Sequence, residues 1–146
     1  VFATVCCGFM PRSALESGTV SEPRLTRIFQ ALQQSKYSIH DLSRCTGEGA
    51  DNFSRFNMPL ELGMAMARRF GDQENEHDWL VLVPTGHTYV RFISDLAAYD
   101  PMTHDGSING VVVAVMQWLA TRDDAVPTVT PREVLGLLPD FQQARQ

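Results

Sequence analysis

Arg55-Phe-Asn-Met-Pro-Leu-Glu-Leu-Gly-Met-Ala-Met-Ala-Arg68 is apolar over most of its length and holds one acidic residue. Its composition predicts a helix that is buried on all sides, with Asn57 or Met58 as its cap. Pro59 fits the first turn, where the amide hydrogen that proline lacks is not needed. Gly63 weakens a helix interior, and it therefore indicates a close approach by another backbone or a ligand.

Glu61 is the only charged residue between Met58 and Ala67. A carboxylate among apolar neighbours costs free energy unless it is paired, hydrogen-bonded or protonated. This cost makes Glu61 a candidate functional residue. A structural interpretation stays open as well, because the helix dipole favours an acidic residue in the first turn and either Arg44 or Arg55 could pair with it.

The composition is that of a soluble globular protein, with 146 residues of which 44% are hydrophobic and 20% charged. This length predicts one domain spanning residues 1–146. The net charge of −5 argues against a nucleic-acid polymer or an anionic membrane as a partner. The N-terminal region lacks a basic leader and an apolar run of about 18 residues, so we expect neither a signal peptide nor a membrane span.

Three cysteines, Cys6, Cys7 and Cys45, are an odd and low count, which favours buried thiols in a reducing, cytoplasmic compartment. The four histidines are scattered, and no cysteine or histidine pair has zinc-site spacing, so we expect no metal. The sequence contains no glycine-rich dinucleotide loop, phosphate-binding loop or serine nucleophile elbow. We therefore expect no bound cofactor.

The pattern of apolar residues predicts strands that alternate with helices. The predicted strands are 1–7, 37–43 and 79–83. The predicted helices are 21–34 with Ser21 as its cap, the helix from Asn57 or Met58, 88–98, 108–119, and 130–138 opened by a capping box. A strand remains an alternative for part of 108–119, because Val111–Val113 is β-branched, and 45–54 is predicted as a polar loop.

Alternating strands and helices are typical of an α/β fold, here with a parallel sheet of three to five strands flanked by helices. Ligands of such folds bind beyond the carboxyl ends of the strands. Phe9 and Arg12 follow the first predicted strand, and Asp41 and Arg44 lie at the end of the second. In a regular strand Asp41 lies on the face opposite His40.

Two motifs, Ile39-His-Asp-Leu-Ser-Arg44 and Asn57-Met-Pro-Leu-Glu-Leu-Gly-Met-Ala65, carry a resemblance to a known family. An aspartate at a strand end, a polar loop and Glu-x-Gly-x-Ala on a helix resemble the nucleoside 2-deoxyribosyltransferase family and the related TIR-like domains that cleave NAD. The same residues resemble small bacterial proteins with an IHDLSR…RFNMPxELG signature. The resemblance covers residues 1–85 and implies a small flavodoxin-like domain.

By that resemblance Glu61 would attack the anomeric carbon of a sugar, and Asp41 would hold or protonate the base. The chemistry is consistent, because N-glycosidic cleavage passes through a cationic sugar that a carboxylate can trap or stabilise. The leaving base then needs a proton or a hydrogen bond. The remaining candidates, as substrate-binding residues, are Phe9, Arg12, Arg44 and Asn57.

The sequence leaves three functional interpretations open. The first is an N-glycosidase or deoxyribosyltransferase that acts on a nucleoside, a nucleotide or NAD. The second is a binding module that senses a nucleotide or associates with itself without turnover, and the third is a structural domain without a small-molecule site. The resemblance also implies a homo-oligomer. The substrate stays open, because the family's extra strand–helix unit between the first strand and the aspartate strand is missing here.

Overall fold

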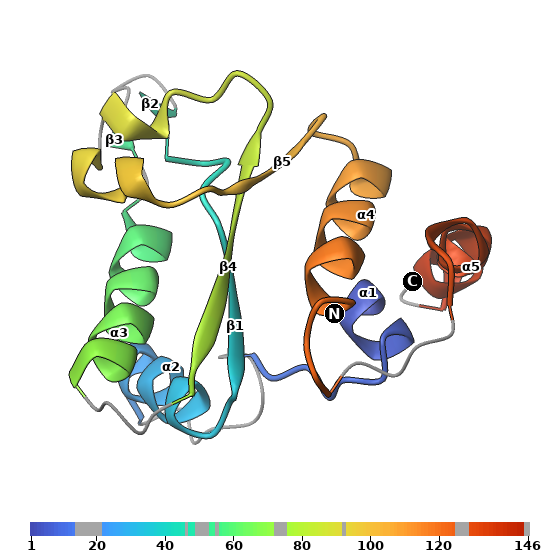
Figure 1. The fold of residues 1–146 in the computed structure, drawn as a ribbon, viewed down its shortest axis with the longest axis horizontal. Helices are drawn as coiled ribbons and strands as arrows, with labels where there is room; N and C mark the ends of the chain where they lie inside the picture. The colour runs from blue at the N-terminus through green and yellow to red at the C-terminus, as the bar shows by residue number, and fades with distance from the viewer. Residues whose placement is uncertain are drawn as a thin grey trace. The chain divides into compact units, whose positions relative to one another are not determined.

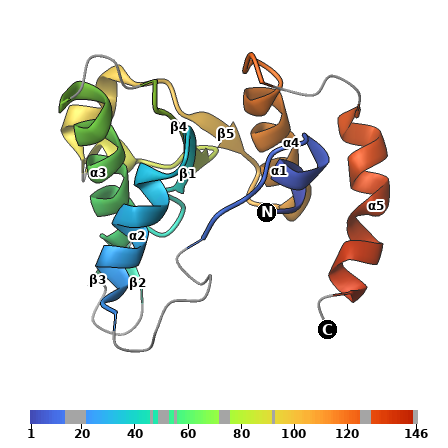
Figure 2. The ribbon, with the colours of Figure 1, turned by 90° about the horizontal axis from the view of Figure 1, so that it is seen from below.

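The computed structural model describes residues 1–13, 22–45, 47–48, 53–54, 56–71, 76–91, 93–124 and 129–144 (Figure 1 and Figure 2). Ser21, predicted as a cap, and Arg55, predicted as a partner of Glu61, lie outside these residues. The chain divides into two compact units, one of residues 12–101 and one of residues 1–11 with 102–146.

The fold is α/β, as predicted, with parallel strands flanked by helices. The 12–101 unit contains the strands β1 (Tyr37–Asp41) and β4 (Asp78–Pro84), and the other unit contains the short strand β5 (Met102–His104). β1 and β4 are parallel, and the amide of Leu42 extends their ladder by donating to the carbonyl of Leu82 at 2.9 Å. The predictions of strands at 37–43 and 79–83 are therefore confirmed.

Two parallel helices, α2 (Arg24–Gln33) and α3 (Asn57–Gly71), lie side by side next to β1 in both views of the ribbon (Figure 1 and Figure 2). Ile28 and Leu32 of α2 pack against Ala65 of α3, and all three side chains are buried. Apolar residues four apart on one helix meet a small residue on the other, so the two axes can approach closely.

The prediction that α3 is buried on all sides is wrong. Leu62 is 1% exposed and Ala65 is fully buried, but Leu60 and Phe70 are 55% and 64% exposed. The reason is that α2 and the sheet cover only part of the helix circumference, and the third side remains open. Among the described residues, no atom outside the helix's own backbone lies within 4 Å of a Cβ built on Gly63, so no close approach by another described element explains that glycine.

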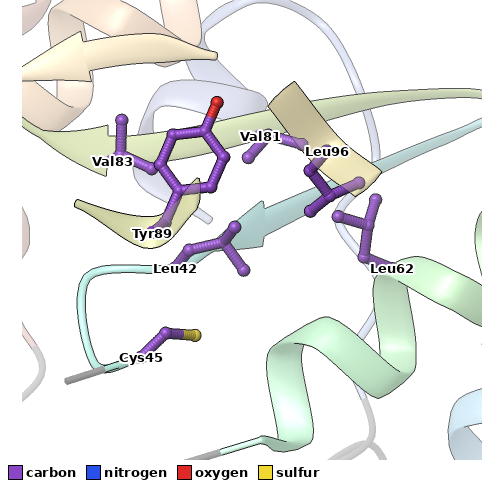
Figure 3. Packing of buried hydrophobic residues seen from close by; sticks show 7 residues of the cluster. All are labelled: Leu42, Cys45, Leu62, Val81, Val83, Tyr89 and Leu96. Carbon is purple, nitrogen blue, oxygen red and sulfur yellow. The ribbon is translucent and has the colours of Figure 1, made fainter. Parts of the chain in front are cut away.

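A core cluster closes the carboxyl half of the β1–β4 pair (Figure 3). It joins one face of the two strands to α3 and to two short 3₁₀ helices, η1 (Tyr89–Arg91) and η2 (Ser94–Ala98). The members of the cluster are Leu42, Cys45, Leu62, Val81, Val83, Tyr89 and Leu96. The single helix predicted for 88–98 is wrong, because Ile93 has an extended backbone (φ −138°, ψ 72°) and ends the first turn.

The first residues of the chain form a helix, α1 (Phe2–Cys6), and the prediction of a strand there is wrong. A short apolar run fits a buried strand and a buried helix equally well, so tertiary packing decides between them. The ring of Phe2 lies 4.9 Å from that of Phe141 in α5 (Pro131–Gln143), and α1 also contacts α4 (Ile108–Leu119). The residues of the predicted strand therefore belong to an all-helical packing.

Side-chain caps start both long helices, α4 and α5, of the unit that contains residues 1–11 and 102–146. Ser107 accepts a hydrogen bond from the amide of Gly110 and starts α4, which confirms the helix and excludes the strand alternative. A Cβ at position 110 would collide with Asp105, so only glycine fits there. The predicted capping box of α5 is confirmed, since Thr130 and Glu133 each accept from the other's backbone amide.

Two further observations complete the fold. The predicted loop 45–54 contains a small antiparallel pair, β2 (Gly47–Glu48) and β3 (Phe53–Ser54), and its other residues from 46 to 52 lie outside the described parts of the chain. Within the described ranges, every helix is too short or too polar to cross a lipid bilayer.

Leu62 and Leu60 provide a matched test of this packing, because they lie on the same helix with opposite exposures. We expect Leu62→Ala to lower the free energy of unfolding by about 2–5 kcal/mol, since it leaves a cavity in the core cluster. Leu60→Ala should change it by no more than about 0.5 kcal/mol. Chemical denaturation at pH 7.5 measures both, and equal losses would contradict the described orientation of α3.

Candidate functional site

The carboxyl edge of the β1–β4 pair is where this fold would place a ligand. Asp41 is the last residue of β1, Arg44 lies three residues further on, and the turn 85–87 follows β4. Because α3 follows β1 and leads into the parallel strand β4, its first residue, Asn57, lies at the same edge. Residues from three elements therefore meet at this edge, and Arg44 and Asn57 are exposed there.

Asp41 is exposed and closes a turn at the end of β1. Its Oδ1 accepts hydrogen bonds from the backbone amide of Ser43, at 2.9 Å, and from the Ser43 hydroxyl. The next residue, Leu42, packs with Leu62 of α3 in the core cluster. Since successive side chains of a strand alternate between faces, Asp41 lies on the face of β1 that does not carry α3.

Glu61 is half-buried one turn into α3, as the fifth residue of the helix. Burial raises the pKa of its carboxyl above the ordinary value, and the nearby guanidinium of Arg24 on α2 lowers it in part. The nearby cation is therefore Arg24, on the neighbouring helix, where the sequence suggested Arg44 or Arg55. Glu61 and Asp41 lie on opposite faces of β1.

Phe9 and Arg12 do not belong to the carboxyl edge. Arg12 donates from its NH1 group to Oε1 of Gln34 at 3.1 Å, and Gln34 ends α2 just before β1 begins. Arg12 therefore lies at the amino end of β1, the end away from Asp41. Phe9 falls in the other unit, where its amide donates to the carbonyl of Thr4 at 3.0 Å.

His87 is a residue of the carboxyl edge that the sequence analysis missed. Both of its ring nitrogens are shielded from solvent and have no hydrogen-bond partner among the described residues, and its ring stacks on that of Tyr89 at 6.3 Å between centroids. Gly86 has a φ of +80°, and the amide of His87 donates to the carbonyl of Pro84, which closes the turn. A Pro-Thr-Gly-His run directly after a predicted strand was the available signal.

A second feature that the sequence analysis missed is a buried polar cluster along β1 and at the start of β4. His40 and His77 are 2% and 1% exposed, and Ser38 lies between them. The Ser38 hydroxyl oxygen is 2.8 Å from Nε2 of His40 and 3.0 Å from Nε2 of His77. Burial lowers the pKa of His40 to about 4, and it also lowers the pKa of His77.

All three cysteines are thiols: Cys6 and Cys7 are half-buried, and Cys45 is buried in the core cluster. Burial, and to a smaller extent the charge of Asp41, raise the pKa of Cys45. A raised pKa keeps a thiol protonated and unreactive at neutral pH. Among the described residues, no three His, Cys, Asp or Glu side chains are grouped to hold a metal ion.

No family model, curated protein or solved structure matches this chain. The resemblance to the deoxyribosyltransferase and TIR-like families therefore stays a prediction. Function is therefore inferred from the residues at the carboxyl edge and from the environment of Glu61.

The raised pKa of Glu61 has a consequence for stability. An acid whose pKa is raised by folding destabilises the folded state once the pH exceeds its ordinary pKa of 4.5. We expect Glu61→Gln to be more stable than the wild type at pH 7.5, by less than about 1 kcal/mol because the group is half-exposed.

The difference between the two proteins should shrink as the pH falls, and it should vanish below 4.5, where Glu61 is protonated in both the folded and the unfolded chain. Denaturation curves at several pH values measure it. As a control, Arg24→Gln should raise the pKa of Glu61 further, as followed by the NMR shift of its carboxyl carbon. A less stable Glu61→Gln protein at pH 7.5 would contradict this account.

Proposed function

We propose that the unit of residues 12–101 binds a nucleoside or nucleotide at the carboxyl edge of its sheet, as a sensing module that does not turn its ligand over. The observation that carries this proposal is the placement of complementary groups at one edge of the strand pair. Asp41 supplies a carboxylate, Arg44 a guanidinium, Asn57 a helix start and His87 an aromatic ring.

Each of these groups suits one part of a nucleotide. An exposed arginine binds phosphate oxygens through paired N–H donors, and the first amides of α3 attract the same negative charge. Asp41 uses Oδ1 in its own turn, which leaves Oδ2 for a sugar hydroxyl. The half-buried ring of His87, beside Tyr89, offers a stacking surface to a base.

The positions of the two predicted catalytic carboxylates favour binding without turnover. Cleavage at a sugar carbon by two carboxylates requires both to flank the same bond, at separations of about 5–10 Å. Asp41 lies on the face of β1 that does not carry α3, and Glu61 lies on α3. One sugar–base unit would have to reach around the end of the strand to touch both.

One observation favours a second candidate function, an N-glycosidase or deoxyribosyltransferase. Glu61 is half-buried and its pKa is raised, as is common for carboxylates that work in catalysis. In this function Glu61 alone would attack or stabilise the anomeric carbon of a nucleoside, a nucleotide or NAD. The nucleophile would then act without the base-side help that the resemblance assigns to Asp41.

A binding and base-release experiment distinguishes the two functions. The protein is incubated with NAD, nucleosides, deoxynucleosides and their monophosphates, and both its melting temperature and the released base are measured. We expect a phosphate-bearing ligand to raise the melting temperature without release of base. Arg44→Gln should weaken that binding about tenfold or more, since it removes a charged hydrogen bond. Arg12→Gln, at the other end of β1, should leave it unchanged.

The alternative outcomes are equally distinct. Base released by the wild type and not by Glu61→Gln would establish the enzyme. Binding that Arg12→Gln and Arg44→Gln weaken equally would exclude the carboxyl edge as its site. If no compound changes the melting temperature or releases a base, the third interpretation, a structural domain without a small-molecule site, would be favoured.

We also propose a cytoplasmic location, because nucleotides are abundant there and thiols stay reduced. The proposal also includes the homo-oligomer that the resemblance implies. Leu25 and Phe29 of α2 are 52% and 46% exposed, and Leu60 and Phe70 of the neighbouring α3 are exposed as well. Exposed apolar side chains on adjacent helices support association.

Light scattering after size exclusion tests the association. We expect a dimer or larger species that Leu25→Ser and Phe29→Ser dissociate together. A monomer at every protein concentration would contradict this part of the proposal.

A further inference from the structure

The buried polar cluster connects four elements of the 12–101 unit. Ser35 follows α2, Ser38 and His40 lie on β1, Arg68 lies on α3, and His77 immediately precedes β4. Nδ1 of His77 is 2.8 Å from the carbonyl oxygen of Ser35, and its Nε2 is 3.0 Å from the Ser38 hydroxyl. Each of these hydrogen bonds therefore joins two different elements, or two residues of β1.

The positions of the protons follow from the partners. The carbonyl of Ser35 can only accept, so Nδ1 of His77 carries its hydrogen. Nε2 of a neutral His77 is then an acceptor, and the Ser38 hydroxyl donates to it. The oxygen of Ser38 in turn accepts from Nε2–H of His40, at 2.8 Å. His40 is left with Nδ1 as a buried acceptor that has no partner in the part of the chain that the structure describes.

Arg68 adds a positive charge to the cluster without using either imidazole. Its NH1 group has two hydrogens, and these go to the carbonyls of Leu32 and Ser35. The same nitrogen lies 3.4 Å from Nδ1 of His77, which already carries a hydrogen and cannot accept. The guanidinium therefore stands next to the imidazole as a charge that opposes its protonation.

We propose that this cluster is an acid-sensitive lock, which holds α2, β1, α3 and β4 together only while both imidazoles are neutral. A proton on Nδ1 of His40 would be a charge on a side chain that is 98% buried and has no acceptor there. A proton on Nε2 of His77 would direct two N–H donors at the Ser38 oxygen and remove the acceptor of its hydroxyl. Either event breaks the chain of hydrogen bonds.

The charged groups that face the cluster oppose its protonation on balance. From α3, Arg68 and Arg69 both face His77, and Arg69 donates to its backbone carbonyl at 3.3 Å. From β4, Asp78 favours the protonated form of His77, and on β1 the facing group is His40, which shares Ser38 with it. Burial is the largest effect on both histidines, and it keeps them neutral.

The direction of the pH dependence follows. The unfolded chain takes up a proton at His40 as the pH falls below the ordinary pKa of 6.5, while the folded chain resists until about pH 4. The contribution of neutral His40 to the free energy of unfolding is therefore fully present above pH 6.5, and it is lost progressively between pH 6.5 and 4. His40 alone should raise the unfolding equilibrium constant about 30-fold between pH 7.5 and 5. Asp and Glu side chains titrate mostly below this window.

Chemical denaturation of the full chain at pH 7.5, 6 and 5 tests the lock. His40→Gln is the informative variant, because its Nε2 still donates to Ser38 but cannot take up a proton. Between pH 7.5 and 5, the unfolding equilibrium constant of this variant should rise about 30-fold less than that of the wild type. The control is Arg12→Gln, at an exposed residue of the same unit outside the cluster, which should keep the full wild-type pH dependence. Equal pH dependence in His40→Gln and the wild type would overturn the proposal.

A second measurement needs no variant and covers the case in which His40→Gln fails to fold. Nitrogen-15 NMR of the imidazoles distinguishes the two neutral tautomers and the charged form. We expect hydrogen on Nδ1 of His77 and on Nε2 of His40 at pH 7.5, with neither ring charged down to pH 5. The opposite tautomer of His77, or a charged ring in the folded protein at pH 6, would overturn the lock.

Discussion

One guanidinium determines how the α/β unit is assembled. Carbonyl groups at the end of a helix must be satisfied when they are covered. At the end of α2, Arg68 of α3 donates to the carbonyl of Leu32 and to that of Ser35, two residues beyond the helix. This contact sets the ends of the two helices at the same level, and it thereby brings Ile28 and Leu32 onto Ala65.

The strand pair carries two kinds of polar side chains. Ser38 and His40 on β1 and His77 before β4 are buried and bonded to one another, and they rigidify the contact between helices and sheet. At the carboxyl edge, Arg44 and Asn57 face solvent. Substitutions of these two exposed residues should therefore leave the fold intact.

The long, strongly patterned segments could be predicted from the sequence: the strands at 37–43 and 79–83, the helices that became α2 and α3, and the capping box of α5. The first seven residues could not, because a short apolar run fits a helix or a strand and its packing partner, Phe141, is at the other end of the chain. The pairing of His40 with His77 depends on the register of two strands and on α3, which local patterns do not encode. The opposite orientations of Asp41 and Glu61 depend on the same packing.

The aromatic residues have an optical consequence. The chain has two tryptophans, and each unit contains one of them. Trp79 packs edge-on between Phe70 and Tyr99, at 5.8 and 6.1 Å between ring centroids, whereas Trp118 lies under the guanidinium of Arg122 at 4.6 Å. The two indoles therefore have different surroundings, one aromatic and one cationic. A chain with a single tryptophan would emit from one unit alone, so fluorescence can report separately on the melting of each.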